Sequence, residues 1–308
     1  MKNLSQMNKQ FFRLEYFNYQ LSKLTRIIQV IITKLITFLY KKKVSSELLL
    51  LMKKNRDSLR GIKEYLPEGE YDSRDNNYGI QNYIFYNLTK EIDLFPTYTD
   101  ILTLLFREFK EDNLIYLEIG TSVFKNFQQI ESNLENAILY GYDMNDLIPS
   151  IKEKYNLIQK ENKNTRQNYY YSKGLNEIYY FKNNVLSKEG SDIFKKLLAG
   201  KVNVIFSDAL HSKKGVLSEY ENIIKGNLSD NFCYCFDDLN MYDVEEGVKK
   251  IYKNLKSENE KIKYFSFWTY GWIGQYEKLH KIGLITTFDI SSIFKKKGIN
   301  LPLFKEIS

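Results

Sequence analysis

Apolar residues change their spacing in a regular way along the chain from residue 97 onward. Segments with helical spacing alternate with short, continuously apolar runs, and such runs are typical of strands buried on both faces. Strands joined through helices require right-handed crossovers and a largely parallel sheet. The sequence therefore predicts an α/β fold of the Rossmann-like, doubly wound type. The predicted helices are 97–110, 127–136, 191–200, 215–226 and 244–255, and the predicted parallel strands are 113–120, 137–143, 202–208 and 232–238.

Two later apolar runs, 262–270 and 281–288, are joined through the short segment GWIGQYEKLH. Antiparallel strands accept short connections, whereas parallel strands need a longer crossover. We therefore expect these two runs to form an antiparallel pair at one edge of the sheet.

The segment 24–43 has the pattern of a helix that is apolar on almost all sides, but Arg26, Gln29 and Lys34 interrupt it. Its uninterrupted apolar runs are too short to span a bilayer comfortably. Two interpretations stay open. The helix packs on the rest of the protein or on a partner, or it lies on a membrane surface with its basic end near anionic headgroups.

A stretch rich in Gly, Asp and Asn, residues 68–79, is typical of a loop or linker. We place a domain boundary there. The expected organisation is an N-terminal helical extension and linker over residues 1–80, followed by the main α/β domain over residues 81–308.

Composition narrows the class of protein. The net charge of +7 comes from lysine-rich segments such as 41–43 and 295–297, which are typical of solvated faces, so nucleic acid is not favoured as a partner. Cys233 and Cys235 lack the spacing of a zinc site or a redox pair and predict buried, reduced thiols. The first twenty residues lack the apolar core of a signal peptide, which favours a cytoplasmic protein. Membrane association through 24–43 and homo-oligomerisation stay open.

Polar residues follow the first two predicted strands. Glu118, Gly120 and Ser122 stand at the end of the first strand, and Asp143 ends the second. In doubly wound sheets that bind nucleotides, an acid after the second strand accepts hydrogen bonds from ribose hydroxyls. The pattern predicts a nucleoside pocket. The alternative is that Glu118 caps a helix and Asp143 begins a turn.

The next two predicted strands end in acids and a histidine. Asp208 and His211 follow one strand, and Asp237 and Asp238 follow the other. Three carboxylates at neighbouring strand ends are hard oxygen ligands suited to Mg²⁺ or another divalent metal. Such a metal would lower the pKa of a bound hydroxyl, and His211 would then remove its proton.

These motifs resemble those of the class I S-adenosylmethionine-dependent methyltransferases. LEIGTS is similar to the glycine motif of that family, Asp143 to its ribose-binding acid, and IFSDALHSKKG and CFDDLN to its later strand-end motifs. The resemblance covers roughly residues 97–290 and is closest to the branch of macrocin O-methyltransferases and cephalosporin hydroxylase-like proteins. It implies S-adenosylmethionine as cofactor. The cofactor-binding residues that it implies are Glu118 near the methionine moiety, Gly120, Thr121 and Ser122 in the lining, Asp143 at the ribose, Asn183 and Asn184 near adenine, and Asp208.

The chain also departs from the family pattern. Phe124 stands where a further glycine is common, Ala209 replaces a glycine, and Leu210 stands where relatives commonly have a second acid. The base would therefore be His211. We expect O-methylation of a sugar or other hydroxylated small molecule or glycan, with Asp208 and His211 as catalytic residues. The alternatives are a noncatalytic or degenerate protein that keeps the fold, and an oxygenase similar to cephalosporin hydroxylase. The residues show no obvious set of two histidines and one carboxylate for iron, which disfavours the oxygenase.

Overall fold

A computed structural model of the chain describes residues 28, 31–36, 38–39, 44–62, 95–109, 114–161, 168–241, 243–274 and 279–308. The chain divides into two compact units, Met1–Lys41 and Lys42–Ser308. In the first unit the described residues are helical, which agrees with the predicted helix over 24–43 as far as these residues extend. The predicted loop at 68–79 and the predicted boundary near residue 80 lie outside the described residues. Among the described helices, none is both long and apolar enough to cross a bilayer.

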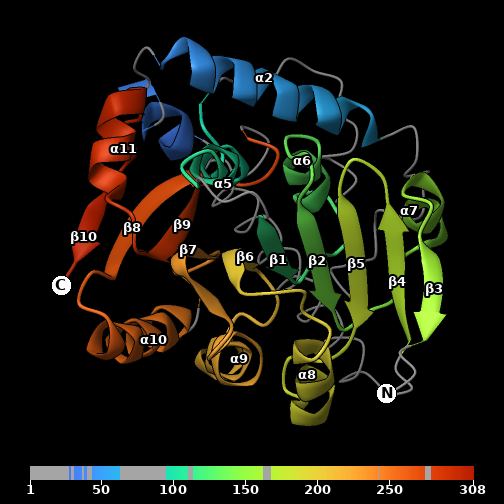
Figure 1. Cartoon of the computed structure of the whole chain (residues 1–308). Coiled ribbons are helices and arrows are strands. Elements are labelled where there is room, and N and C mark those ends of the chain that lie inside the picture. The colour runs from blue at the N-terminus through green and yellow to red at the C-terminus, as the bar shows by residue number, and fades with distance from the viewer. Residues whose placement is uncertain are drawn as a thin grey trace, which may run out of the picture. The chain divides into compact units, whose positions relative to one another are not determined.

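The second unit is built on a ten-stranded sheet with the order β10-β8-β9-β7-β6-β1-β2-β5-β4-β3 (Figure 1). Its centre is parallel: β1 pairs with β2 on one side and β6 on the other, β2 with β5, and β6 with β7. The doubly wound α/β fold predicted from the sequence is confirmed. The strands are β1 (Ile115–Ile119), β2 (Ile138–Asp143), β3 (Ile158–Glu161), β4 (Asn168–Lys173), β5 (Glu177–Lys182), β6 (Val202–Ser207), β7 (Leu228–Phe236), β8 (Lys263–Tyr270), β9 (Leu279–Thr286) and β10 (Lys305–Ile307).

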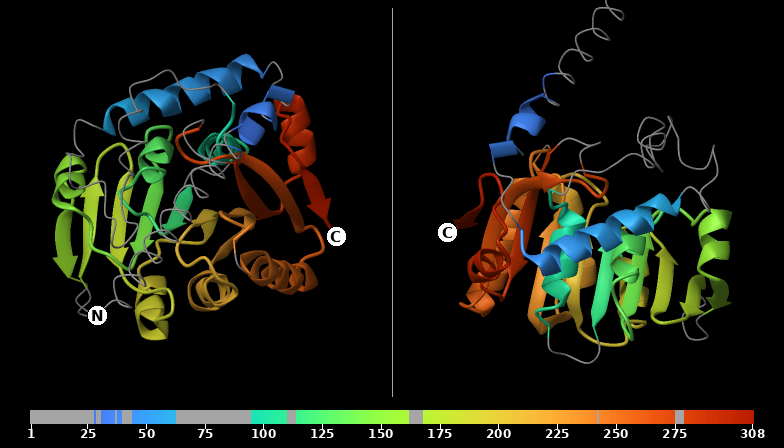
Figure 2. Two further views of the ribbon diagram at one scale, coloured as in Figure 1. Left: turned by 180° about the vertical axis from the view of Figure 1, so that it is seen from behind. Right: turned by 90° about the horizontal axis from the view of Figure 1, so that it is seen from above.

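Helices cover both faces of the sheet (Figures 1 and 2). Helices α8 (Lys188–Lys195), α9 (Lys213–Glu219) and α10 (Val244–Glu258) lie on one face. Helices α2 (Ser46–Arg60), α5 (Tyr98–Phe106), α6 (Phe127–Glu131) and α11 (Ile290–Lys297) lie on the other, and α7 (Pro149–Lys154) follows β2. Alternation along β1 divides the core between them. Tyr116 packs edge-on against Phe106 of α5, whereas Leu117 and Ile119 join a cluster that contains Val216 of α9.

Both edges of the sheet extend beyond the prediction. The predicted antiparallel pair is present as β8 and β9, but β9 lies between β7 and β8, and β10 pairs with the outer side of β8. The pair therefore does not form the edge itself. At the opposite edge, an antiparallel hairpin of β3 and β4 adds to β5. Its tyrosines are only partly buried and stand among Asn and Lys, so no apolar run marks these strands in the sequence.

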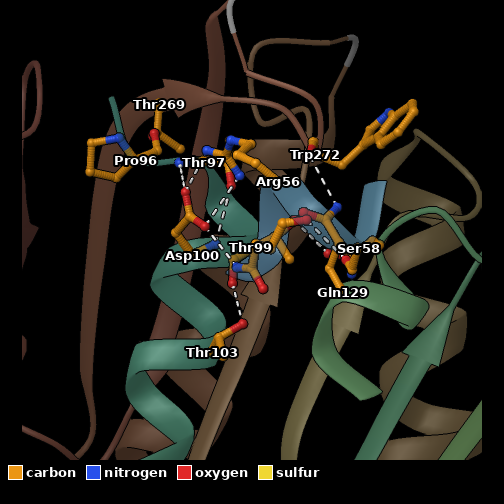
Figure 3. A network of polar contacts seen from close by, with 12 residues as sticks. Arg56, Ser58, Pro96, Thr97, Thr99, Asp100, Thr103, Gln129, Thr269 and Trp272 are labelled. Atoms are coloured by element: carbon orange, nitrogen blue, oxygen red, sulfur yellow. Dashed lines mark hydrogen bonds and ion pairs between the residues drawn. The ribbon is translucent and has the colours of Figure 1, made fainter. Parts of the chain in front are cut away.

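Helix α2 belongs to the second unit, although it lies within the segment predicted as an extension. It begins after Ser45, whose side chain accepts a hydrogen bond from Leu48 N, and it packs against α5 and α6. Arg56 of α2 is buried and forms an ion pair of 2.7 Å with the fully buried Asp100 of α5. Figure 3 shows this pair within a polar network that also includes Thr97, the N-cap of α5. Helix α2 is thus held against α5 by buried polar contacts as well as by packing.

The predicted helix over 215–226 is two elements. An α-helix, α9, ends at Glu219, and a π-helical turn, η1 (Tyr220–Ile224), continues it. Single π-turns of this kind occur mostly within α-helices and often near functional sites. Here the turn follows directly after a buried carboxylate, Glu219.

Candidate functional site

The topology of the sheet selects one position for a ligand. Strand β2 pairs with one side of β1, and β6, which follows much later in the chain, pairs with the other side of β1. In open α/β sheets, ligands bind outside the carboxyl ends of the strands where the strand order reverses in this way. The carboxyl ends of β1, β2, β6 and β7 carry Gly120, Asp143, Asp208 and the pair Asp237 and Asp238. These residues, all predicted from the sequence, therefore lie at the edge of the sheet that the carboxyl ends of the parallel strands form.

Gly120 follows β1 with a φ of +88°, a conformation that favours glycine. A Cβ at this position would lie 2.2 Å from the carbonyl oxygen of Asp208. The Gly120 N–H donates to Tyr142 O, and the Asp208 N–H donates to Ile119 O, 2.8 Å in each case. The absence of a side chain at Gly120 thus allows the segments after β1 and β6 to meet directly, whereas the sequence suggested only a close approach to a ligand.

The loop after β1 surrounds Asp143 with backbone donors. Ser122 N donates to Asp143 Oδ2 and Asn145 N to Oδ1, both at 2.9 Å. Burial raises the pKa of Asp143 above its usual value, and hydrogen bonds from these amides and from Met144 and Thr121 oppose that shift. These amides fix the direction of the Asp143 carboxylate, and the residue is 7% exposed. Asp143 thus lies where the sequence predicted the acid at the end of the second strand.

Thr121 and Phe124 complete this loop in different ways. Thr121 is 1% exposed, and its Oγ1 has no hydrogen-bond partner among the residues that the structure describes. Phe124 has a φ of +60°. A non-glycine residue is uncommon in this conformation. Its ring is buried and stacks on Phe127 with the ring centroids 4.3 Å apart. Aromatic packing therefore holds a loop conformation that glycine adopts more readily.

Glu118 lies on β1 and is 2% exposed. Its Oε2 accepts hydrogen bonds from the Tyr116 hydroxyl at 2.6 Å and from Asn126 Nδ2 at 2.9 Å. Burial raises the pKa of Glu118 to about 8, although these two bonds act in the opposite direction. Asn126 Oδ1 in turn accepts from Thr99 Oγ1 of α5. The carboxyl group is therefore fixed in position and mostly neutral near pH 7.

Asn183 and Asn184 lie at the carboxyl end of β5. The Asn183 N–H donates to Asp143 O at 2.7 Å, which places this residue directly beside the predicted ribose-binding acid. The side-chain oxygen of Asn183 accepts from Asn184 N, and that of Asn184 accepts from Leu186 N. Both acceptors thus close local turns of the backbone. Asn183 and Asn184 therefore lie at the predicted edge of the sheet, and their side-chain oxygens already accept hydrogen bonds from the backbone.

Asp237 and Asp238 follow β7, and His280 of β9 joins them. His280 Nδ1 lies 2.8 Å from Asp237 Oδ1 and 3.4 Å from Asp238 Oδ1. Ligand atoms of the three residues all lie within 4.8 Å of one another. Asp238 has a φ of +51°. His280 was missed from the sequence, because β9 runs antiparallel and its first residues, not its last, reach this edge.

His211 faces acids on both sides. Its Nε2 lies 3.8 Å from Asp208 Oδ1, and its Nδ1 lies 3.7 Å from Asp238 Oδ2. Burial and the neighbouring Asp237 raise the pKa of Asp208 well above its usual value, and Lys125 opposes this shift. Asp208 and Asp238 thus lie on either side of His211. Among the described residues, the set of mutually close ligand atoms consists of Asp237, Asp238 and His280, so it includes two of the three predicted metal ligands and one histidine.

Lys125 interacts with two of the acids and with Trp272. Lys125 lowers the pKa of both Asp208 and Glu118, and its Nζ lies 5.4 Å from the centroid of the Trp272 ring. Trp272 is 3% exposed, and its carbonyl oxygen accepts from Gln129 Nε2 of α6 at 3.0 Å (Figure 3). Trp272 is thus buried, and its ring contacts a cation that lowers the pKa of Asp208 and Glu118.

Glu219 supports the segment that carries Asp208 and His211. It is fully buried, its Oε2 accepts from Ser207 Oγ at 2.5 Å, and the Leu210 N–H also faces the carboxyl group. Burial raises the pKa of Glu219 to about 8. The Leu210 carbonyl accepts from Ser212 N at 2.7 Å, and a Cβ at Gly215 would lie 2.3 Å from this oxygen. The Leu210 side chain is exposed, while its backbone is fixed from both sides.

Comparisons with known proteins give the following results. The chain matches no protein-family model. No curated protein matches it. Among solved structures it is similar to the MycE methyltransferase of the mycinamycin biosynthetic pathway in complex with Mg, SAH and mycinamycin VI, with 13% identity and a TM-score of 0.32 over 53% of this chain. The matched part spans only 37% of the MycE chain.

Two further solved structures are similar over more of their length. The plantazolicin methyltransferase BamL, in complex with a triazolic desmethylPZN analog and SAH, has 12% identity and a TM-score of 0.38 over 78% of this chain and 98% of its own. An rRNA methylase from Streptococcus thermophilus has 9% identity and a TM-score of 0.37 over 61% of this chain and 93% of its own.

Proposed function

We propose that the protein transfers a methyl group from S-adenosylmethionine to a hydroxyl oxygen of a sugar or another hydroxylated small molecule or glycan, with the help of a divalent cation. One observation carries the proposal. His211 lies between Asp208 and Asp238, and the Gly120 turn joins this segment directly to the loop that surrounds Asp143. The residue proposed as proton acceptor, a group of acids and the loop proposed to hold the cofactor thus lie together at the switch point of the sheet.

The residues at the ends of β1 and β2 would hold the cofactor. Asp143 would accept the ribose hydroxyls, and the backbone from Gly120 to Ser122 would line the pocket above the buried Glu118. S-adenosylmethionine supplies an electrophilic methyl group on sulfur. Attack by an acceptor oxygen requires alignment and exclusion of water and no covalent enzyme intermediate. The role of the chain's residues on this side is therefore to bind and to orient.

The acids at the ends of β6 and β7 fit a cation. Asp237, Asp238 and His280 offer carboxylate oxygens and an imidazole nitrogen within one small volume, and Asp208 lies close enough to Asp237 to raise its own pKa. Clustered carboxylates repel one another unless positive charge lies between them. A divalent cation held there would lower the pKa of a bound acceptor hydroxyl.

His211 would accept the proton of the acceptor hydroxyl. Carboxylates face both ring nitrogens at 3.7–3.8 Å, so they stabilise the charged imidazolium that forms. Glu219 and Ser207 hold the backbone that presents this ring. Leu210 offers no carboxyl group, which leaves His211 as the base in this segment.

Binding and turnover test the proposal separately. Isothermal titration calorimetry should show binding of S-adenosylmethionine, and chelation should abolish methyl transfer to a polyhydroxylated acceptor while leaving cofactor affinity largely intact. The variant His211→Ala should keep cofactor affinity and lower turnover by about 10²- to 10⁴-fold, the usual contribution of a positioned base. The proposal fails if the cofactor does not bind, or if turnover is unchanged in chelator. Tight cofactor binding without transfer to any acceptor would favour a protein that keeps the fold for binding.

A second candidate function has its own observation. His211 lies 3.7 Å from Asp238 Oδ2 and His280 lies 3.4 Å from Asp238 Oδ1, so two histidines flank one carboxylate. Such a set is typical of non-haem iron oxygenases. Anaerobic titration with Fe²⁺, followed by measurement of oxygen consumption with and without S-adenosylmethionine, separates this candidate from the methyltransferase.

A further inference from the structure

The helix of the first unit exposes large apolar side chains to solvent. Its described residues include six such side chains, and each is about half exposed or more. They are Ile28 at 47%, Ile31 at 60%, Ile32 at 49%, Leu35 at 59%, Phe38 at 75% and Leu39 at 67%. Clustered exposure of this kind is unusual on a soluble surface and marks a site of contact with another apolar surface. The proposed catalytic function does not involve this helix.

The exposed residues share one face of the helix. Their spacing along the chain is three, one, three, three and one residues, which places them on a single stripe. Thr33, between two of them in sequence, is 8% exposed. The polar residue is therefore the more buried one, and the apolar stripe is not used for packing within the described part of the chain.

The charge around this helix has one sign. From residue 16 to residue 46 the sequence contains basic residues and no acidic residue. Glu15 and Glu47 are the nearest acids on either side. The basic residues of this stretch are Lys23, Arg26, Lys34, Lys41, Lys42 and Lys43. An exposed apolar stripe flanked only by positive charge is complementary to a bilayer surface with anionic headgroups.

We propose that this helix binds the surface of an anionic lipid bilayer and lies in the interface with its apolar stripe toward the acyl chains. A second copy of the helix fits less well. The stripe spacing also suits a paired helix, but two copies would bring like charges together without an acid to pair with them. The binding requires neither the cofactor nor the metal and goes beyond the proposed methyl transfer.

Sedimentation of the full chain with vesicles tests the proposal. The protein should sediment with vesicles of phosphatidylcholine and phosphatidylserine, much less with phosphatidylcholine alone, and less at high salt. Leu35→Asp and Phe38→Asp should each lower the partition coefficient at least about tenfold, because each removes a large apolar side chain from the contact. Lys34→Glu should lower it about fivefold or more.

Leu50→Asp is the matched control, since Leu50 is an equally exposed apolar residue (68%) on α2 of the second unit. It should leave vesicle binding unchanged, and circular dichroism should show that all variants are folded. The proposal is overturned if the wild type does not sediment with anionic vesicles, or if Phe38→Asp sediments equally well. It is also overturned if the wild type is a dimer without lipid and Leu35→Asp and Phe38→Asp make it monomeric, since the stripe then binds a second copy.

Discussion

His280 Nδ1 lies 2.8 Å from Asp237 Oδ1, although the two residues are 43 positions apart in the sequence. Asp238 Oδ1 lies 3.4 Å from the same nitrogen. The 2.8 Å separation is that of a direct hydrogen bond, and adjacent ligands of an octahedral cation with bonds of about 2.1 Å are also about 3 Å apart. The structure thus adds a nitrogen donor to a site that the sequence described by carboxylates alone.

Removal of this nitrogen donor should weaken metal binding. His280→Ala should lower the affinity for Mn²⁺ about tenfold or more, because one of the proposed ligands is lost. Calorimetric titration of the metal-free protein measures this directly. His211→Ala serves as the comparison, since His211 does not belong to the set of mutually close ligand atoms. Equal affinities for wild type and His280→Ala would exclude His280 as a ligand.

Asp143 should contribute to cofactor affinity. Asp143→Ala should weaken S-adenosylmethionine binding by about 1.5–3 kcal/mol, the range for hydrogen bonds to a charged group. Titration calorimetry on the folded variant gives the value. Asp146→Ala is a suitable control, because Asp146 lies three residues further on, is 43% exposed and pairs with Lys152. A loss of affinity of the same size in both variants would show a general effect of charge and not a ribose contact.

Alanine substitutions at three glycines should separate the cost of a positive φ from the cost of a steric clash. Gly120→Ala should lower the free energy of unfolding by about 3 kcal/mol or more, because it combines a positive φ with a clash against the Asp208 backbone. Gly226 has a φ of +79° and open space around it, so Gly226→Ala should cost about 1 kcal/mol. Gly174→Ala meets no atom within 4 Å and should change stability by less than about 0.5 kcal/mol. Urea unfolding gives this order, and any other order contradicts the direct contact of the two segments.

The buried ion pair between α2 and α5 should contribute far more to the free energy of unfolding than the exposed ion pair next to it on α2. Arg56→Ala should lower the free energy of unfolding by about 3–5 kcal/mol, because Asp100 would remain buried with its charge uncompensated. Arg60 lies one turn further along α2 and pairs with Asp57 at the surface, so Arg60→Ala should cost less than about 0.5 kcal/mol. Similar losses in both variants would contradict a structural role for the Arg56–Asp100 pair.

Glu219 should make stability depend on pH. Burial raises its pKa from 4.5 to about 8, so between these values the folded state binds more protons than the unfolded state. The contribution of Glu219 to stability is therefore fully present below about pH 4.5 and is lost as the pH rises toward about 8. Glu219→Gln cannot titrate. Its stability should fall less steeply between pH 5 and 8, by up to about 1.4 kcal/mol per pH unit, in urea unfolding at several pH values. Identical slopes for the two proteins would mean that Glu219 is ionised in the folded state.

The central strands were predictable from the sequence because burial on both faces leaves continuous apolar runs. Ile205 and Phe206, for example, point to opposite faces of β6, and both are fully buried. Acids placed just after such strands necessarily reach the same edge of a parallel sheet, so Asp143, Asp208 and Asp237 were found. The hairpin of β3 and β4 was missed because its residues are exposed or only partly buried, and polar residues flank its three consecutive tyrosines on both sides.

The remaining contacts at the site depend on tertiary structure. His280 is the second residue of β9, and only the antiparallel direction of this strand brings it to the acids. Lys125, in the segment after β1, acts electrostatically on Asp208. Glu219, at the end of α9, accepts a hydrogen bond from Ser207 at the end of β6. No local spacing predicts these three positions, since each depends on how two elements pack.

Because β9 lies between β7 and β8 in the sheet, the strands of this half cannot pair in the order in which they are synthesised. Both neighbours of β8 in the sheet, β9 and β10, follow it in the chain. As the chain leaves the ribosome, β8 therefore emerges before any strand with which it pairs, and this half of the sheet cannot close until residue 286 is available. His280 arrives with that same strand. The segment from β1 to β7 can assemble earlier on the growing chain, whereas His280 reaches Asp237 and Asp238 only after β9 has emerged.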